Sequence, residues 1–257
     1  MARLGEIIYE SQIWKSVFRH PMPVDRRNRI VVMLTNFFLH LHPVSIKKQG
    51  IALSYTWCMG GVTFFLFLVE TVTGVLLMFY YRPTLEWAYN DILALRDIYS
   101  LGIMREIHRW GAHAMVITVW LHMYRVFLTG SYKPPREFNW VIGVILLLLT
   151  LLLSFTGYLL PWDQLAVWAI TVGSNMARAT PGLGHEGPGH QLLYLGYPMI
   201  TSGTDARFAL LGARNVGEET LNRFYILHCI AIPLAVSLLL AIHFWRVRKD
   251  GGISGPL

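Results

Sequence analysis

Two strongly apolar stretches of the sequence each carry two histidines at nearly the same spacing. His108 and His122 are 14 residues apart, and His228 and His243 are 15 residues apart. At ~1.5 Å and ~100° per residue of an α-helix, either spacing returns to nearly the same face. Because an ionisable ring in a lipid-spanning helix is costly without a partner, matched pairs on two helices indicate a shared ligand. The pattern predicts bis-histidine ligation of two stacked haem irons.

The elements that must position these histidines are membrane-spanning helices. Of the 257 residues, 54% are hydrophobic and 14% are charged, which is too apolar for an ordinary soluble domain. A helix needs ~20 apolar residues to cross the hydrocarbon core. Four stretches are long enough, and they cover residues 53–81, 103–128, 140–160 and 224–247. The sequence therefore predicts an all-α membrane protein, built as a four-transmembrane-helix haem-binding bundle.

The distribution of Lys and Arg predicts the topology of these spans. Basic residues concentrate before the first span, in the second connection and after the last span, whereas the first and third connections are net acidic. By the positive-inside rule, both termini lie on the cytoplasmic or equivalent side. This topology accounts for the net charge of +7, so the charge does not indicate nucleic-acid binding.

Two segments lie outside the spans. Residues 1–50 mix apolar and basic residues, which predicts a first domain with an amphipathic helix on the cytoplasmic leaflet; a flexible basic tail is the alternative. Residues 51–257 form the predicted dihaem domain. Its connection over residues 163–220 is long and partly apolar, so we expect short helices on the outer membrane surface. No signal peptide is visible in residues 1–50, and we expect the first span to act as the insertion signal.

The order of the spans predicts which histidines pair. The second and fourth spans run in the same direction, because one span separates them. His108 and His228 are therefore expected to hold a haem near the outer surface, and His122 and His243 one near the cytoplasmic surface. Nearby arginines are candidate partners for the haem propionates, although snorkelling at span ends explains them equally well. They are Arg105, Arg109, Arg125, Arg223, Arg246 and Arg248.

The first and third spans repeat the spacing with glycine. Gly60 and Gly74 are 14 residues apart, as are Gly143 and Gly157. Since glycine has no side chain, these positions would let porphyrin edges approach the helix backbones. Small-residue packing between helices is the alternative. Together with the histidines, the pattern favours the haem interpretation.

Other polar residues in the apolar stretches have less definite roles. His113 lies five residues after His108 and points to another face, so we predict a hydrogen-bonded residue at a helix contact. Glu70 is mid-span and needs a proton or a partner; it is either a proton relay or a neutral, hydrogen-bonded acid. His185 and His190 lie in the outer connection, and the sequence assigns them no role.

The two cysteines are predicted to lie near opposite membrane surfaces. Cys58 is at the start of the first span and Cys229 is beside His228 in the fourth. Their separation is then far beyond the ~7 Å between Cα atoms that a disulfide allows. From the sequence alone, Cys58 is a small buried apolar residue.

Seven short stretches between residue 51 and residue 257 form a specific pattern. They are Tyr-Thr-Trp-Cys-Met-Gly-Gly at 55–61, Phe-Tyr-Tyr-Arg-Pro-Thr at 79–84, His-Arg-Trp at 108–110, Arg-Val-Phe-Leu-Thr-Gly at 125–130, Gly-Tyr-Leu-Leu-Pro-Trp-Asp-Gln at 157–164, Thr-Leu-Asn-Arg-Phe-Tyr at 220–225 and Gly-Ile-Ser-Gly-Pro-Leu at 252–257. The pattern resembles the cytochrome b family in its short, split form, closest to cytochrome b6 and its menaquinol-oxidising bacterial relatives.

The resemblance implies two b-type haems in a four-helix bundle. It also implies that Cys58 forms a single thioether bond to an extra, c-type haem on the cytoplasmic side, although no Cys-x-x-Cys-His motif is present. In this family, quinol is oxidised near the outer surface. One electron passes to a Rieske iron–sulfur protein, and the other crosses the bilayer through both b haems to quinone. Protons are released outside and taken up inside.

The resemblance further implies a multisubunit oxidoreductase. The Pro-Glu-Trp-Tyr element of the family's outer quinol site is absent, so a subunit IV-like protein is expected to supply it. A Rieske protein, a c-type cytochrome, quinone and membrane lipid are the other implied partners, in a dimer of the whole complex. The chain would not be active without these partners. It would lie in a bacterial cell membrane or a thylakoid membrane. Residues 173–219 match the family poorly.

Two other functions use the same residues. A dihaem membrane anchor of a dehydrogenase or hydrogenase would explain the histidines, but not the combined Cys58, glycine and Pro-Trp-Asp-Gln pattern. A scaffold bundle with structurally satisfied histidines would bind no haem.

Overall fold

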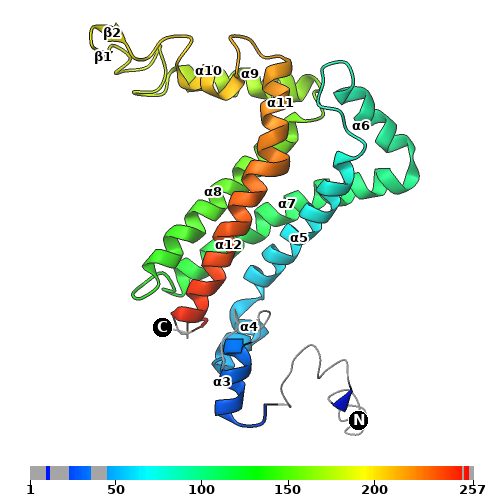
Figure 1. Ribbon diagram of the computed structural model, residues 1–257, viewed down its shortest axis with the longest axis vertical. Helices are drawn as coiled ribbons and strands as arrows, with labels where there is room; N and C mark the ends of the chain where they lie inside the picture. The colour runs from blue at the N-terminus through cyan, green and yellow to red at the C-terminus, as the bar shows by residue number, and fades with distance from the viewer. Residues whose placement is uncertain (1–9, 12–22, 36–44, 251, 255–257) are drawn as a thin grey trace. The chain divides into compact units, whose positions relative to one another are not determined.

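The computed structural model describes residues 10–11, 23–35, 45–250 and 252–254, and this part of the chain is mostly helical (Figure 1). The chain forms two compact units. The first contains residues 1–58, 124–143 and 240–257, and the second contains residues 59–123 and 144–239. The predicted amphipathic helix of residues 1–50 lies largely outside the described residues, and the predicted boundary at residue 50 stays a prediction.

The first unit contains few complete elements. They are α3 (Arg26–Thr35), the 3-10 turn η1 (Lys48–Ile51) and α4 (Leu53–Thr56). The last turns of α7 (Tyr99–Leu128), the first turns of α8 (Glu137–Leu159) and the last turns of α12 (Ile232–Lys249) also belong to this unit.

The second unit contains most of the long helices. Its elements in chain order are α5 (Met59–Met78), α6 (Ala88–Asp97), most of α7, most of α8, α9 (Gln164–Arg178), the antiparallel hairpin of β1 (Leu193–Tyr194) and β2 (Tyr197–Pro198), α10 (Ala206–Leu211), α11 (Glu218–Ile226), the π turn η2 (Leu227–Ala231) and the first turns of α12.

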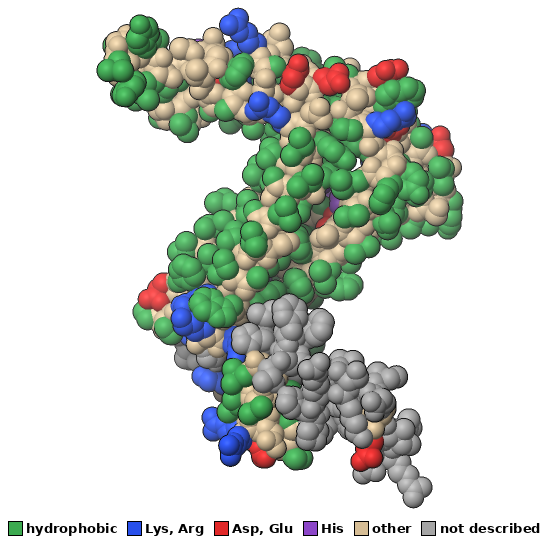
Figure 2. Space-filling model, viewed as in Figure 1, with side chains coloured by type: hydrophobic (Ala, Val, Ile, Leu, Met, Phe, Trp, Pro, Cys, Tyr) green, Lys and Arg blue, Asp and Glu red, His purple; other side chains and the backbone are tan. Residues whose placement is uncertain are grey.

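Three of the described helices are long and apolar enough to cross a membrane by length and composition. They are Met59–Met78, Glu137–Leu159 and the continuous helix Glu218–Lys249. Large apolar side chains on them, such as Phe65, Leu148 and Leu238, are exposed, and Figure 2 shows hydrophobic side chains along α5 and α8. Outward apolar groups are what lipid-facing helices require. Three of the predicted spans thus correspond to helices that could cross a membrane.

The fourth predicted span corresponds to α7. This helix is 30 residues long, but three histidines and four charged residues within it lower its average apolar character. Helices that carry ionisable residues in a membrane place them toward the protein interior. Because composition alone does not separate such a helix from a soluble one, the fourth span stays a prediction.

Short helices form in the long connection between α8 and α11, as the sequence predicts. Asp163 caps α9 by accepting a hydrogen bond from the backbone N–H of Ala166 at 2.8 Å, and Asp205 caps α10 through Phe208 in the same way. Such caps satisfy donors that a helix start leaves free. The β1–β2 hairpin of this connection was not expected.

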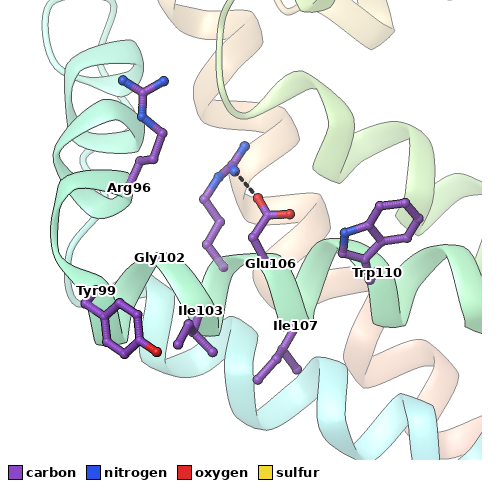
Figure 3. A pocket seen from close by; sticks show the side chains of 8 residues that line it. Arg96, Tyr99, Gly102, Ile103, Glu106, Ile107 and Trp110 are labelled. Carbon is purple, nitrogen blue, oxygen red and sulfur yellow. Dashed lines mark hydrogen bonds and ion pairs between the residues drawn. The ribbon is translucent and has the colours of Figure 1, made fainter.

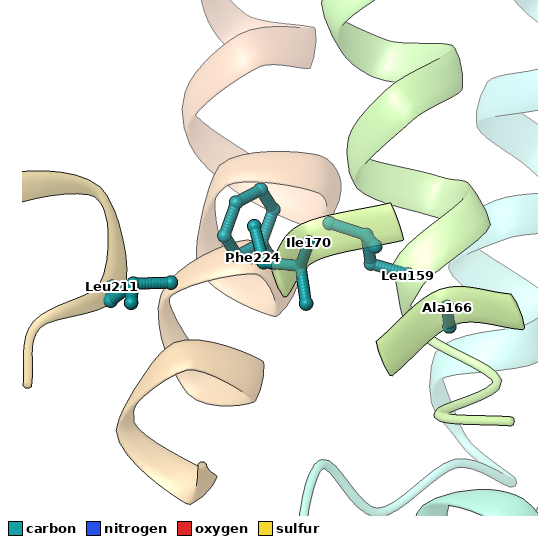
Figure 4. Packing of buried hydrophobic residues seen from close by; sticks show 5 residues of the cluster. All are labelled: Leu159, Ala166, Ile170, Leu211 and Phe224. Carbon is teal, nitrogen blue, oxygen red and sulfur yellow. The ribbon is translucent and has the colours of Figure 1, made fainter. Parts of the chain in front are cut away.

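A small core fixes these short helices to the long ones (Figure 4). Leu159, Ala166, Ile170, Leu211 and Phe224 are fully or almost fully buried and pack together. They come from α8, α9, α10 and α11, which are four consecutive helices of the second unit. Because their burial removes apolar area from water, it holds the connection against the ends of the spans.

Candidate haem site

The rings of His108 and His228 lie edge-on to each other in the second unit. His108 projects from α7 and His228 from the π turn η2. Their ring centroids are 6.2 Å apart and their planes are nearly perpendicular, at 84°. The structure therefore brings together the two histidines that the sequence predicts to share the outer haem.

Hydrogen bonds orient the ring of His228. Its Nδ1 lies 3.2 Å from Oγ1 of Thr156 and 3.1 Å from the backbone oxygen of Leu153. The Thr156 hydroxyl donates its own proton to backbone oxygens of its helix, that of Leu152 at 2.9 Å among them. Both neighbours of Nδ1 are thus acceptors, which assigns the ring hydrogen to Nδ1 and leaves the Nε2 lone pair for a metal.

The ring of His108 is held by an equivalent arrangement. Its Nδ1 lies 2.9 Å from Oγ1 of Thr73 and 3.1 Å from Oε2 of Glu70. The Thr73 hydroxyl donates to the backbone oxygen of Val69 at 2.7 Å. The same reasoning places the hydrogen of His108 on Nδ1 and makes Nε2 the ligating atom. The two imidazoles are therefore in the same tautomer, with the hydrogen on Nδ1.

Three of the predicted glycines lie directly against imidazole rings. A Cβ added at Gly157 would be 2.5 Å from Cε1 of His228, and one at Gly74 would be 3.1 Å from Cε1 of His108. At Gly60 the distance to Cε1 of His122 would be 3.2 Å. These glycines make room for the histidines themselves. That they also admit porphyrin edges stays a prediction, as does the role of Gly143.

The sequence analysis missed Thr73 and Thr156. Each stands immediately before one of the ring-facing glycines, so a Thr-Gly pair recurs at 73–74 and 156–157. On a helix, neighbouring residues lie ~100° apart, which lets the glycine face the ring while the threonine reaches its edge. The repeated dipeptide was the available signal.

The π turn explains why the two histidine spacings differ by one residue. In α7, 14 residues turn ~1400°, which is ~40° short of four full turns. A π turn accommodates one more residue than an α turn, and η2 contains His228. The 15-residue spacing in this helix is therefore equivalent to 14 residues of regular α-helix.

Arg125 is a candidate partner for a haem propionate in the first unit. Its guanidinium lies over the ring of Tyr55, 4.6 Å from the centroid. Its Nε and one terminal nitrogen are buried and have no hydrogen-bond partner among the described residues, and the same holds for the Tyr55 hydroxyl. Buried donors without acceptors are costly. A carboxylate supplied by a bound group would satisfy them.

These observations fit a haem. The described residues contain no cluster of three or more His, Cys, Asp or Glu that would hold a bare metal ion. A porphyrin provides the other ligands of its iron, so two opposed imidazoles are a sufficient protein contribution. In the second unit, the Nδ1 contacts of His108 and His228 leave both Nε2 atoms free to bind an iron. In the first unit, the unsatisfied donors of Arg125 match a propionate.

Comparison with known proteins decides the family. Residues 44–251 match the family model described as Cytochrome b/b6/petB. The chain belongs to the cytochrome b family. It is thus a multi-pass membrane subunit of an oxidoreductase complex that binds b-type haem.

Relatives support the b6-like form. The chain is 40% identical to cytochrome b6 of Synechocystis sp., over 78% of this chain and 82% of that protein. It is 37% identical to the menaquinol:cytochrome c reductase cytochrome b subunit of Bacillus subtilis, over 91% and 96%. A solved structure titled Hyperthermophilic respiratory Complex III matches with a TM-score of 0.66 and 26% identity, over 77% of this chain. The match spans 48% of that longer chain.

Other predicted site residues of this cytochrome b lie in different surroundings. His122 belongs to the second unit and His243 to the first, so their pairing stays a prediction. Cys58, which the sequence alone predicts to be buried, is instead an exposed free thiol at the break between α4 and α5, where its φ is +50°. Cys229 is also a free thiol. The role of Arg248, in the last turn of α12, stays a prediction too.

Arg105 and Arg109 both pair with Glu106. The distances from guanidinium nitrogen to carboxylate oxygen are 2.9 Å for Arg105 and 2.5 Å for Arg109. Glu106 lines a pocket of about 490 Å³ between α6 and α7, together with Arg96 and Trp110 (Figure 3). Their predicted contact with propionates stays a prediction, and the Glu106 pairing was not foreseen.

Three further histidines in the described part of the chain are hydrogen-bonded. His113 contacts the backbone oxygen of Arg109 at 2.7 Å, so its partner is its own helix. His185 pairs with the side chain of Asp205, and His190 contacts the backbone oxygen of Gly187 at 2.9 Å. The Asp205 contact ties the loop before the hairpin to the start of α10, a role that the sequence did not reveal.

Proposed function

We propose that this cytochrome b holds two b haems and carries electrons across the membrane within a quinol-oxidising complex of the bc or b6f type. His108 and His228 would bind the outer haem, and His122 and His243 the inner one. The observation that carries the proposal is the opposition of the His108 and His228 rings, each with its Nδ1 engaged and its Nε2 available.

The residues around the outer pair would prepare the site for its cofactor. A haem supplies reversible one-electron transfer when it is bound. Thr73 and Thr156 fix the tautomer of the two rings, and Gly74 and Gly157 let the rings approach α5 and α8. Because these contacts fix the orientation of both rings, haem binding would require little reorganisation of them.

The inner pair is supported by spacing and by the surroundings of single residues. His122 lies against Gly60 as His108 lies against Gly74. The π turn restores the spacing of His228 and His243 to that of the α7 pair. Arg125 offers buried donors for a propionate. A helix rise of ~1.5 Å per residue separates the two ligand levels by ~21 Å.

Quinol would be oxidised on the outer side and quinone reduced on the inner side, with proton release and uptake on the corresponding sides. The name of the Bacillus subtilis relative points to menaquinol as the substrate class. A subunit IV-like protein, a Rieske iron–sulfur protein and a c-type cytochrome would complete the enzyme, as a dimer of the whole complex.

A third, covalent haem at Cys58 is part of the proposal. The thiol of Cys58 is exposed in the turn between α4 and α5. The backbone N–H of Cys58 donates to Oγ1 of Thr56 at 3.2 Å. Exposure is what a thiol needs in order to add to a vinyl group. The c-type attachment would lie on the cytoplasmic side.

Haem stoichiometry tests the proposal. We expect pyridine haemochrome spectra of the purified complex to give two extractable b haems per chain. The variants His108→Ala and His228→Ala should each lose the same one of these haems, whereas His113→Ala, on the same helix as His108, should keep both. A chain that purifies without haem, or His108→Ala with full haem content, would contradict the proposal. Co-purification with a Rieske protein distinguishes this enzyme from a dehydrogenase anchor.

A further inference from the structure

Glu70 contacts one of the two opposed imidazoles from inside a membrane span. It projects from the middle of α5, and its Oε2 lies 3.1 Å from Nδ1 of His108. Its side chain is only 14% exposed. The other carboxyl oxygen, Oε1, is buried and has no hydrogen-bond partner among the described residues. Among the described residues, the ring of His108 is thus the polar partner of this carboxyl group.

The two rings differ in this acceptor. At His228, the second oxygen beside Nδ1 is the backbone carbonyl of Leu153, which is neutral. At His108, the corresponding oxygen belongs to a carboxyl group. The threonine hydroxyls are equivalent at both rings. The pair is therefore asymmetric in one respect, and that respect is a side chain able to carry charge.

The backbone of α7 makes room for this carboxyl group. A Cβ added at Gly111 would lie 2.1 Å from Oε1 of Glu70 and 3.3 Å from its Cδ. Glycine at 111 thus allows the carboxyl group to fit between α7 and the ring of His108. Any side chain there would push the carboxyl group from its present place.

We propose that Glu70 is a positioning residue that orients His108 and lowers the reduction potential of the outer haem. This inference rests on the proposed ligation by His108 and His228. A carboxylate that accepts the Nδ1 hydrogen strengthens the imidazole as a ligand. An ionised carboxyl group there would also stabilise the oxidised iron more than the reduced iron, because the oxidised centre is the positive partner that a buried carboxylate requires.

Redox titration of the complex with Glu70→Gln tests this role. Glutamine keeps the size and an acceptor oxygen but removes the charge. We expect the outer haem to become easier to reduce, by about tenfold or more in the equilibrium constant, which is ~59 mV per tenfold for one electron. The inner haem serves as an internal control and should keep its potential.

A second variant changes the geometry without changing residue 70. Gly111→Ala should displace the carboxyl group from His108. We expect the potential of the outer haem to rise, as in Glu70→Gln, but by a smaller amount. Gly173→Ala is the matched control, because its Cβ would meet only Phe155 at 3.6 Å, and it should leave both potentials as they are.

The outcomes separate this inference from the proposed function. If Glu70→Gln and Gly111→Ala both retain two haems and neither changes the potential of the outer one, the role of Glu70 is wrong and the haem ligation stands. If His108→Ala retains its full haem content, the ligation itself is wrong.

Discussion

Gly157 has no room for a side chain, because a Cβ there would lie 2.5 Å from Cε1 of His228. Gly157→Ala is therefore expected to force the ring away and to cost about 1–3 kcal/mol of overpacking. Gly74→Ala, with 3.1 Å to His108, should be milder. Haem content and thermal unfolding of the purified complex measure the order. Equal retention of the outer haem in both variants would contradict the close fit.

The threonine beside each ring gives a second prediction. Thr156→Val removes the hydroxyl that lies 3.2 Å from Nδ1 of His228. Removing such an outer partner typically lowers affinity for the bound metal group by about 10–100-fold. We expect the variant to release the outer haem more readily during extraction. The control is Thr150→Val in the same helix, whose hydroxyl bonds only to the backbone oxygen of Leu146; it should behave as the parent does.

Cys58 and Cys229 form a natural pair of variants. If Cys58 carries a thioether, Cys58→Ser should abolish the haem that stays with the protein after acid-acetone extraction, while the two extractable haems remain. Cys229→Ser should leave the retained haem in place. Spectra of the extracted protein and its mass decide the matter. The absence of retained haem in the parent chain would reduce Cys58 to a free surface thiol.

The connection between α5 and α7 has a pH-dependent ion pair. Arg82 donates hydrogen bonds from its side chain and its backbone N–H to Asp91, and the side-chain bond is the main reason that the pKa of Asp91 lies below its usual range. A lowered pKa means that the stabilisation is complete above the unfolded-state pKa and is lost as the pH falls through the folded one. Acid should therefore loosen α6.

Hydrogen exchange of α6 at neutral and acidic pH measures this loss. Asp91→Asn should loosen α6 already at neutral pH and remove most of the pH dependence. Asp97→Asn is the matched control, because Asp97 is 75% exposed and its contact with Arg96 is long, at 3.8 Å. The pair would be unimportant if both variants exchanged like the parent.

His185 supports a buried carboxylate in the outer connection. The Asp205 side chain is 1% exposed. Burial raises the pKa of this carboxyl group, but the backbone N–H of Phe208 and the ring of His185 outweigh that effect and lower it overall. His185→Ala should leave the carboxylate short of a partner and cost about 1–3 kcal/mol. Limited proteolysis should then cut residues 179–205 faster than in His190→Ala, whose ring contacts only a loop carbonyl.

Sequence spacing predicted the main features of the site because they depend on helix geometry. The pairing of His108 with His228 follows from the order and direction of the spans, and the structure confirms that these rings meet. The sequence predicts that a flat group lies close to the backbone at Gly74 and Gly157. In the structure this group is the imidazole ring and not a porphyrin edge. Three of the four predicted spans are helices of the required length and composition.

Side-chain partners were harder to predict, because they depend on contacts between helices. The partnership of Thr73 with His108 joins α5 to α7 across 35 positions of sequence. Arg105 and Arg109 form ion pairs with Glu106, their neighbour on the same helix. A carboxylate within one helical turn competes with a haem propionate for these guanidinium groups. The π turn also has no sequence signature, because it is defined by backbone hydrogen bonds.

The π turn at Leu227–Ala231 determines where the length of this span can change during evolution. Deleting one of residues 229–231 would convert the wide turn into an ordinary α turn and keep the two histidines on their common face. Deleting one residue between 232 and 242 would instead rotate His243 by ~100° relative to His228. Insertions and deletions that survive selection in this helix should therefore accumulate at the turn, because a change of length there keeps the relative orientation of the two histidines.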